Sequence, residues 1–169
     1  DFSDVLVAMN PAAIKANGKW IKPGGTIIYD ENNFTEKNIE KAGYEKDPIK
    51  EEKLDSYNII AAPISYMVKE ALKDFGLDPK SVLRTKNMFA LGMVYWLFDR
   101  KLDYTEEYFI KKFQTKPELA EANKIALRAG YYYAETIEAL SSVYKILPAQ
   151  IAAGTYRNIS GNIATAWGL

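Results

Sequence analysis

The sequence predicts an α/β protein: a Rossmann-like open sheet that is truncated at its N-terminal side, followed by a helical C-terminal half. Short apolar runs that alternate with helical patterns are typical of parallel strands joined by helices. Such runs occupy residues 4–9, 26–30 and 57–63. From about residue 80 onward, apolar residues recur at every third or fourth position, which indicates helices alone.

The first predicted unit is a strand, a short helix and a second strand. Asn10 and Pro11 follow the first apolar run, and these residue types are favoured at the cap and first position of a helix, here over 11–16. A turn at 22–25 precedes the second strand. A parallel strand is normally paired on both sides, so a chain that opens on one has either an edge strand or further strands upstream. We expect truncation at both ends.

The third strand lies between two further helices. Thr35 is the expected cap of a helix over 36–42, which Gly43 ends. Residues 46–56 are polar and contain Pro48, which favours a loop with an edge element. After the third strand, helical spacing extends over 64–75 and stops before a glycine.

Three helices are predicted in the second half. Asn87 is the expected cap of a helix over 88–99, whose apolar residues run all round and therefore predict burial. A second helix starts at Thr105. Pro117 opens a long third helix, whose apolar column predicts close packing against other helices. This column consists of Leu119, Ala122, Ala126, Ala129, Tyr133, Ile137, Leu140 and Tyr144.

Composition excludes several classes of function. Lys and Arg together number 22, as do Asp and Glu, and the zero net charge argues against general attraction to nucleic acid or anionic membranes. Cys and His are both absent, so disulfides, cysteine-held clusters and Ser-His-Asp catalysis are excluded and no metal site is predicted. No signal peptide is visible, and a soluble cytoplasmic protein is the simplest interpretation.

A few polar residues are candidates for ligand contacts. Asn10 follows the first strand, at the edge where open α/β sheets bind ligands, but a plain helix cap is the favoured interpretation. Arg157 precedes a Gly161-Asn162 turn and could clamp an anion or anchor the chain, with the two roles evenly weighted. A structural role is favoured for residues 30–33, because no glycine-rich phosphate loop precedes them.

Four segments together resemble one known family, the 2-oxoacid:ferredoxin oxidoreductases. Three are similar to its gamma-type catalytic domain: Val5–Tyr29 (VLVAMNPAAIKANGKWIKPGGTIIY), Lys86–Phe98 (KNMFALGMVYWLF) and Lys112–Glu135 (KFQTKPELAEANKIALRAGYYYAE). The fourth, TYRNISGNIATAWGL at the end of the chain, is similar to the start of the alpha-type domain. The resemblance implies a gamma-type domain over 1–145 that lacks its first strand and Gly-rich loop, a connector over 146–159 and the start of an alpha-type domain over 160–169.

The domain order resembles that of the long alpha subunit of two-subunit enzymes, often of the 2-oxoglutarate type. This resemblance implies oxidative decarboxylation of a 2-oxoacid, preferably 2-oxoglutarate, to acyl-CoA, with electrons passed to ferredoxin. Thiamine pyrophosphate, Mg, iron–sulfur clusters and coenzyme A would belong to the assembled enzyme, and none of them to this chain alone. The implied partners are a thiamine-binding beta subunit and ferredoxin, and homo-oligomer formation stays open.

The sequence also departs from the family pattern. The family's Gly-x-Gly-Gly-Gln-Gly stretch does not occur, and its Pro-x-Thr-Pro loop would follow Leu169. We therefore expect no catalytic residue in this chain, a lid-like packing role, and no activity of the chain alone. Asn10, Arg157, Gly161 and Asn162 are the candidate cofactor-binding residues. The alternative is a stand-alone α/β ligand-binding or subunit-interaction module without catalysis.

Overall fold

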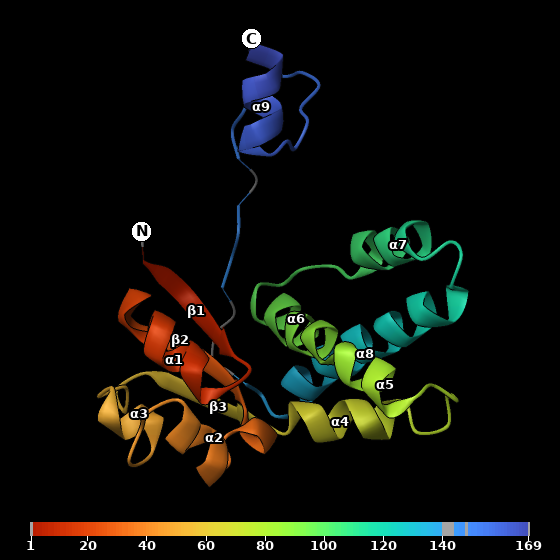
Figure 1. Ribbon diagram of the computed structural model, residues 1–169. Helices are drawn as coiled ribbons and strands as arrows, with labels where there is room; N and C mark the ends of the chain where they lie inside the picture. The colour runs from red at the N-terminus through yellow and green to blue at the C-terminus, as the bar shows by residue number, and fades with distance from the viewer. Residues whose placement is uncertain (1, 140–143, 148, 169) are drawn as a thin grey trace.

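A parallel three-stranded sheet in the order β1-β2-β3 organises the first half of the chain (Figure 1). Its strands are β1 (Ser3–Ala8), β2 (Ile21–Asp30) and β3 (Asn58–Ala62). Val7 pairs with Ile28, and Ile28 pairs with Ile60, so the centres of the three strands are aligned. The predicted α/β class is confirmed, and β1 is an edge strand among the residues that the structure describes.

The computed structural model describes residues 2–139, 144–147 and 149–168. Leu140, Pro148 and Leu169, which belong to the predicted long helix, connector and terminal segment, lie outside the described residues.

Helices cover both faces of the sheet, because successive strand residues point to opposite sides. Ile27 faces a cluster with Ile14 of α1 (Pro11–Asn17) and Ile49 of α3 (Pro48–Glu51). The next residue, Ile28, belongs to the cluster on the other face. The result is a layer of helices on each side of a central sheet.

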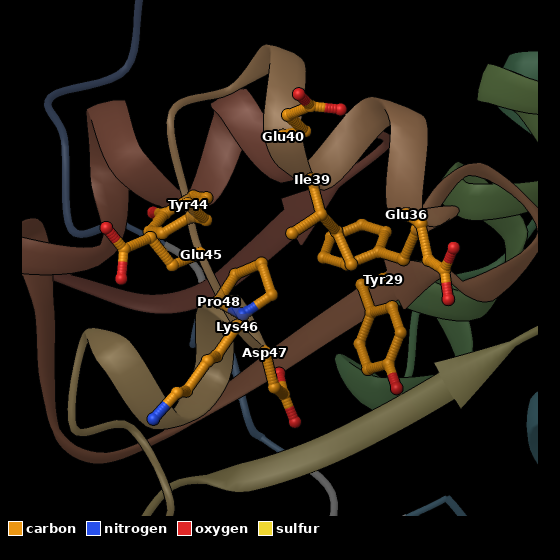
Figure 2. A pocket seen from close by; sticks show the side chains of 10 residues that line it. Tyr29, Glu36, Ile39, Glu40, Tyr44, Glu45, Lys46, Asp47 and Pro48 are labelled. Carbon is orange, nitrogen blue, oxygen red and sulfur yellow. The ribbon is translucent and has the colours of Figure 1, made fainter.

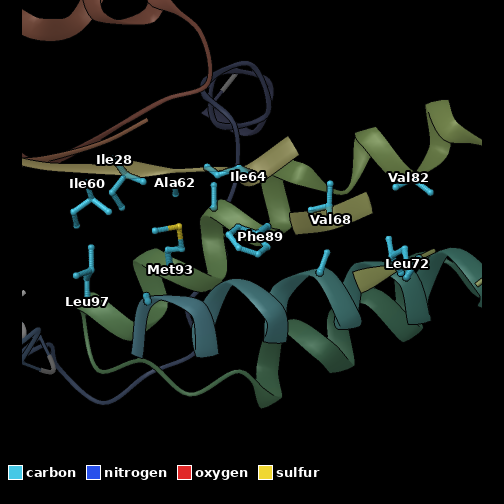
Figure 3. Packing of buried hydrophobic residues seen from close by; sticks show 14 residues of the cluster. Ile28, Ile60, Ala62, Ile64, Val68, Leu72, Val82, Phe89, Met93 and Leu97 are labelled. Atoms are coloured by element: carbon cyan, nitrogen blue, oxygen red, sulfur yellow. The ribbon is translucent and has the colours of Figure 1, made fainter. Parts of the chain in front are cut away.

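The larger cluster joins the sheet to α4 (Ile64–Ala71), α6 (Lys86–Leu97) and α8 (Pro117–Thr136). Figure 3 shows Ile60 above Met93 and Leu97 of α6 in this cluster. The predicted burial of the apolar helix is confirmed, because Phe89, Met93 and Leu97 are all fully buried. The helix α7 (Asp103–Lys112) packs outside α8 through the buried Phe109.

The turn predicted at 22–25 lies inside β2. Ser3 pairs with Ile21 whereas Val5 pairs with Thr26, so β2 contains extra residues opposite β1. A Cβ at Gly25 would lie 2.9 Å from the carbonyl oxygen of Asp4. The close approach of β1 therefore converts the expected turn into a bulge within one longer strand.

Two short helices differ from expectation. Residues 46–56 contain α3 and no edge strand, because Asp47 caps the helix by accepting a hydrogen bond from Ile49 N at 2.9 Å. The helix α5 (Pro79–Arg84) was not predicted, although Asp78 and Pro79 supply the same cap-and-proline signal as Asn10 and Pro11. Both helices are too short for a periodic apolar pattern.

Asn87 is not a helix cap. It lies inside α6, which begins at Lys86. The N-cap residue of α6 is Thr85, whose hydroxyl does not cap the helix and donates instead to Val82 O at 2.8 Å. Asn123, a polar residue within α8, donates its side-chain amide to Leu119 O of its own helix at 2.7 Å.

The long third helix ends at Thr136, short of the predicted end at Tyr144. The backbone N–H of Tyr144 donates to Leu97 O at 2.7 Å, and its ring stacks on Phe98 with centroids 4.9 Å apart. Its hydroxyl lies 3.1 Å from Thr26 Oγ1 on β2. Contacts with α6 and the sheet therefore outweigh the helical spacing that includes Tyr144.

The last element, α9 (Gly161–Gly168), stands apart from the rest of the chain at the top of Figure 1. None of its described residues is buried, and Trp167 is 64% exposed. No described helix combines the length and apolarity that a lipid bilayer crossing requires.

Candidate functional site

The carboxyl ends of the strands hold a buried polar network centred on Asp30. This residue is fully buried and accepts hydrogen bonds from Ser65 N at 3.1 Å, Ser65 Oγ at 2.6 Å and Asn33 Nδ2 at 2.6 Å. A buried carboxylate needs such partners, and protein groups supply them here. The Asp30 network thus ties the end of β2 to the start of α4, as the favoured structural role for residues 30–33 predicts.

Two N–H groups at the N-terminus of α4 donate hydrogen bonds to side chains at the end of β2 and just after it. Asn32 Oδ1 accepts a hydrogen bond from Tyr66 N at 2.8 Å, and Asp30 accepts from the preceding N–H. The first N–H groups of a helix are those that bind anions. Asp30 at the end of β2 and Asn32 in the following turn η2 (Glu31–Asn33) already accept from Ser65 N and Tyr66 N, so these two N–H groups are not available to a phosphate or carboxylate ligand.

Asn10 acts as a helix cap. Its Oδ1 accepts a hydrogen bond from Ala13 N at 3.0 Å, and its backbone is extended, as expected at an N-cap. A shallow hollow of about 270 Å³ lies beside it, lined also by Asn38 and Lys41. Among the hydrogen bonds of the described residues, the side-chain amide group of Asn10 donates none.

The other three candidate residues lie at the far end of the chain. Arg157, Gly161 and Asn162 are exposed, and α9 lies away from α1 in Figure 1. Ser160 Oγ accepts a hydrogen bond from Ile163 N at 3.4 Å and so caps α9. The structure does not bring Asn10 together with these three residues.

A cavity of about 810 Å³ lies on the α1–α3 side of the sheet. We call it the β2–α2 pocket, because β2 forms one wall and α2 (Glu36–Lys41) another. Tyr29, Ile39 and Pro48 face one another across it in Figure 2. Tyr29 and Phe34 also contact each other, with ring centroids 4.6 Å apart. The floor of the pocket is therefore mostly aromatic and aliphatic.

Carboxylates surround this floor. Glu36, Glu40, Glu45 and Asp47 line the pocket, with Lys46 as the one cation in its lining. All five side chains are exposed, and Figure 2 shows the carboxyl groups of Glu36, Glu40 and Asp47 directed away from the centre. We call these four carboxylates the acidic rim.

The two tyrosines of the pocket are influenced by its burial and charge. Burial, followed by the negative charges of Asp47 and Glu31, raises the pKa of Tyr29. Burial and the hydrogen bond from Tyr44 Oη to Glu52 Oε1, at 2.8 Å, raise the pKa of Tyr44. Both phenols are therefore neutral at ordinary pH, mainly because burial disfavours the charged phenolate, and the nearby carboxylates add to this effect.

Sequence reasoning did not find the β2–α2 pocket. Its acidic residues are visible between positions 36 and 47, but the order alone does not show that they surround Tyr29 and Pro48. Within the described residues, no group of three His, Cys, Asp or Glu side chains is arranged to hold a metal ion. The pocket thus offers hydrophobic contact and negative charge, without a nucleophile or metal centre.

The chain is similar to known proteins in both sequence and structure. The chain is 43% identical over all 169 residues to the 2-oxoglutarate oxidoreductase subunit KorA of Mycobacterium tuberculosis, and it covers 26% of that protein. It also resembles a structure of 2-oxoglutarate:ferredoxin oxidoreductase from Magnetococcus marinus with 2-oxoglutarate, coenzyme A and succinyl-CoA bound. That match has a TM-score of 0.60 at 24% identity and covers 89% of this chain and 23% of the other. At this identity the structural likeness shows the fold alone.

The chain spans about a quarter of the length of these two proteins. The family model described as pyruvate ferredoxin/flavodoxin oxidoreductase matches residues 1–133, which include the sheet, both helical layers and the β2–α2 pocket. The family resemblance of the sequence segments is confirmed. The chain belongs to the pyruvate ferredoxin/flavodoxin oxidoreductase family.

Proposed function

We propose that this chain contributes to a 2-oxoacid:ferredoxin oxidoreductase that converts 2-oxoglutarate to an acyl-CoA and passes electrons to ferredoxin. The observation that carries this proposal is the 43% identity to a 2-oxoglutarate oxidoreductase subunit, which extends over the whole chain. Domains of one family at this identity share their fold and commonly their place in an assembly. The name of that relative, and the domain order expected from the sequence, support 2-oxoglutarate as the substrate.

The chain supplies packing and positioning in this proposal, and no bond-making group. Thiamine pyrophosphate would supply the electron sink for decarboxylation. The chain has no Cys, so cysteine-held iron–sulfur clusters would be bound by other parts of the assembly. A gamma-type domain over 1–145 would cover the active site, and 160–169 would begin the alpha-type domain that helps bind the thiamine cofactor.

The four candidate residues have different parts in this proposal. Arg157, Gly161 and Asn162 are exposed and available to contact a cofactor or substrate in the assembled enzyme. Asn10 uses its Oδ1 within the chain, so only its side-chain amide group would serve a ligand. A thiamine-binding beta subunit and ferredoxin are the proposed partners, and the cytoplasm is the proposed compartment.

The proposal is tested with the complete protein and the chains that co-purify with it. We expect reduction of a viologen dye that requires both 2-oxoglutarate and coenzyme A, with pyruvate as the comparison substrate. Reduction with pyruvate alone would retain the enzyme class and change the substrate. If no 2-oxoacid supports reduction of the dye by the assembly, the proposal is wrong.

A further inference from the structure

The β2–α2 pocket has an apolar floor and an acidic rim, and a side chain that is both long and cationic can contact both. Its floor is apolar, with Tyr29, Ile39 and Pro48 at its centre, and its rim carries four carboxylates. Lys and Arg side chains have an apolar stem and a cationic end, so they bury the first and keep the second at a charged boundary. We propose that the pocket docks a Lys- or Arg-bearing segment of a partner protein chain.

The charges of the lining favour a cation strongly. Four carboxylates against one lysine leave the lining with an excess of negative charge. The ion pairs of the described residues join Lys22 to Asp4, Lys73 to Glu70, Lys124 to Glu121 and Arg128 to Glu106, so the acidic rim is in none of them. The rim therefore has no cationic partner within the described chain, and an incoming cation would be attracted by all four carboxylates.

Nearby cations of the chain do not fill the pocket. Lys15 donates to Ala42 O at 3.0 Å and Gly43 O at 2.9 Å, and its Nζ lies 4.8 Å from the ring centroid of Tyr44. This lysine thus closes the C-terminal end of α2. Lys46 points away from Tyr29 and Ile39 in Figure 2.

The aromatic floor adds a second attraction for the same group. A cation placed over a tyrosine or phenylalanine ring is attracted by the negative face of the ring. Tyr29 and Phe34 form a contiguous aromatic surface in the pocket, with ring centroids 4.6 Å apart. Burial is the main cause of the raised pKa of Tyr29, and the negative charges of Asp47 and Glu31, close to this surface, raise it further.

The shape of the site favours a protein segment over a small molecule. Polar groups in small-molecule sites converge on the ligand. Here the carboxyl groups of Glu36, Glu40 and Asp47 point outward in different directions in Figure 2. A polypeptide that lies across the opening can contact several of them at once, with one side chain inserted into the floor. The acidic rim would repel nucleic acid and anionic membranes.

This inference rests on the proposed function for the existence of partner chains, and carboxylate labelling of the native assembly tests it without measuring activity. The reagents are a carbodiimide and glycine ethyl ester, and Glu135 of α8 is the internal control, because it is exposed like Glu40. We expect the acidic rim to be labelled severalfold more slowly than Glu135, and the difference to disappear when salt separates the chains. If the docked residue is a lysine, carbodiimide without the ester should cross-link it to a carboxylate of the acidic rim. If the rim is labelled slowly but no cross-link forms, the docked residue is an arginine, because a guanidinium does not react with the activated carboxylate.

A matched pair of variants gives an independent readout. Glu40 and Glu135 both lie in the last turn of a helix, where a lysine is favourable to the helix dipole, so both variants should fold. Glu40→Lys should release the partner at severalfold lower salt in size-exclusion chromatography, and Glu135→Lys should not. Equal release by both variants, or rim labelling equal to that of Glu135, would overturn the docking site. The docking site would also be overturned if desalting made the acidic rim react as fast as Glu135 while the chains stayed together. A small molecule, and not a partner chain, would then occupy the pocket. If the assembly is active but its acidic rim is labelled as fast as Glu135, the docking site is wrong and the proposed function still stands.

Discussion

Gly130 of α8 packs directly against the backbone of Phe89 in α6. A Cβ at Gly130 would overlap the carbonyl oxygen of Phe89, and a Cβ at Gly92 would overlap that of Leu127. The two glycines thus allow the helices to approach each other backbone to backbone. This crossing lies within the larger hydrophobic cluster and holds α6 and α8 against the sheet.

Gly130→Ala should destabilise the protein, although alanine is normally the better helix former. Helix propensity alone would favour alanine by about 1 kcal/mol. Overpacking a well-packed core costs roughly 1–3 kcal/mol, occasionally more, and the overlap with Phe89 involves backbone that cannot rotate away. Urea unfolding should therefore show a lower free energy of unfolding. Gly161→Ala, with open space around it, is the control and should show no loss.

Tyr144→Phe tests the contact between the segment after α8 and the sheet. The substitution removes the 3.1 Å hydrogen bond with Thr26, which is fully buried, and keeps the stacking on Phe98. We expect a loss of about 1 kcal/mol in the free energy of unfolding, the usual net value of a hydrogen bond. Thr26→Val and the double variant complete a mutant cycle. Strictly additive effects would show that the two hydroxyls do not interact.

Asn10 variants separate its capping role from a ligand contact. Asn10→Ala should lower the free energy of unfolding by about 1 kcal/mol, because Ala13 N loses its partner. Asn10→Asp keeps the acceptor and should retain stability. If the amide group contacts a cofactor, Asn10→Asp should nevertheless lower the activity of the complete assembly. Full activity in that stable variant would limit Asn10 to capping.

Tyr44 should make stability dependent on alkaline pH. Burial and the hydrogen bond to Glu52 raise the pKa of Tyr44 above its ordinary value of 10.0. A raised pKa in the folded state means that the neutral phenol stabilises the fold fully below about pH 10, and that this contribution is lost as the pH rises further. The free energy of unfolding should fall above pH 10 more steeply in the wild type than in Tyr44→Phe. Parallel pH profiles would contradict this assignment.

Local signals were reliable where one or two residues set the backbone. Asn10-Pro11 and Thr35 predict the starts of α1 and α2, and the side chains of both caps accept the expected hydrogen bonds. The same type of signal at Asp78-Pro79 begins α5, which sequence analysis missed because the helix is too short for a period. The extended β2 was missed for a different reason: Pro23 and Gly25 are turn residues, and only the approach of β1 at Asp4 places them in a strand.

The order of the three strands and of the longer helices, the burial of α6 and the membership of the family could be predicted from residue patterns, because apolar spacing, caps and similar segments are local properties of the chain. The β2–α2 pocket could not, since it exists only where Tyr29 of the sheet, Ile39 of α2 and Pro48 of α3 meet. Packing also determines that α8 ends at Thr136 and that Tyr144 returns to the sheet. Tyr144 contacts Thr26, Leu97 and Phe98, which all lie far from it in the chain, and apolar spacing along the chain does not reveal such contacts because it reports only local neighbours.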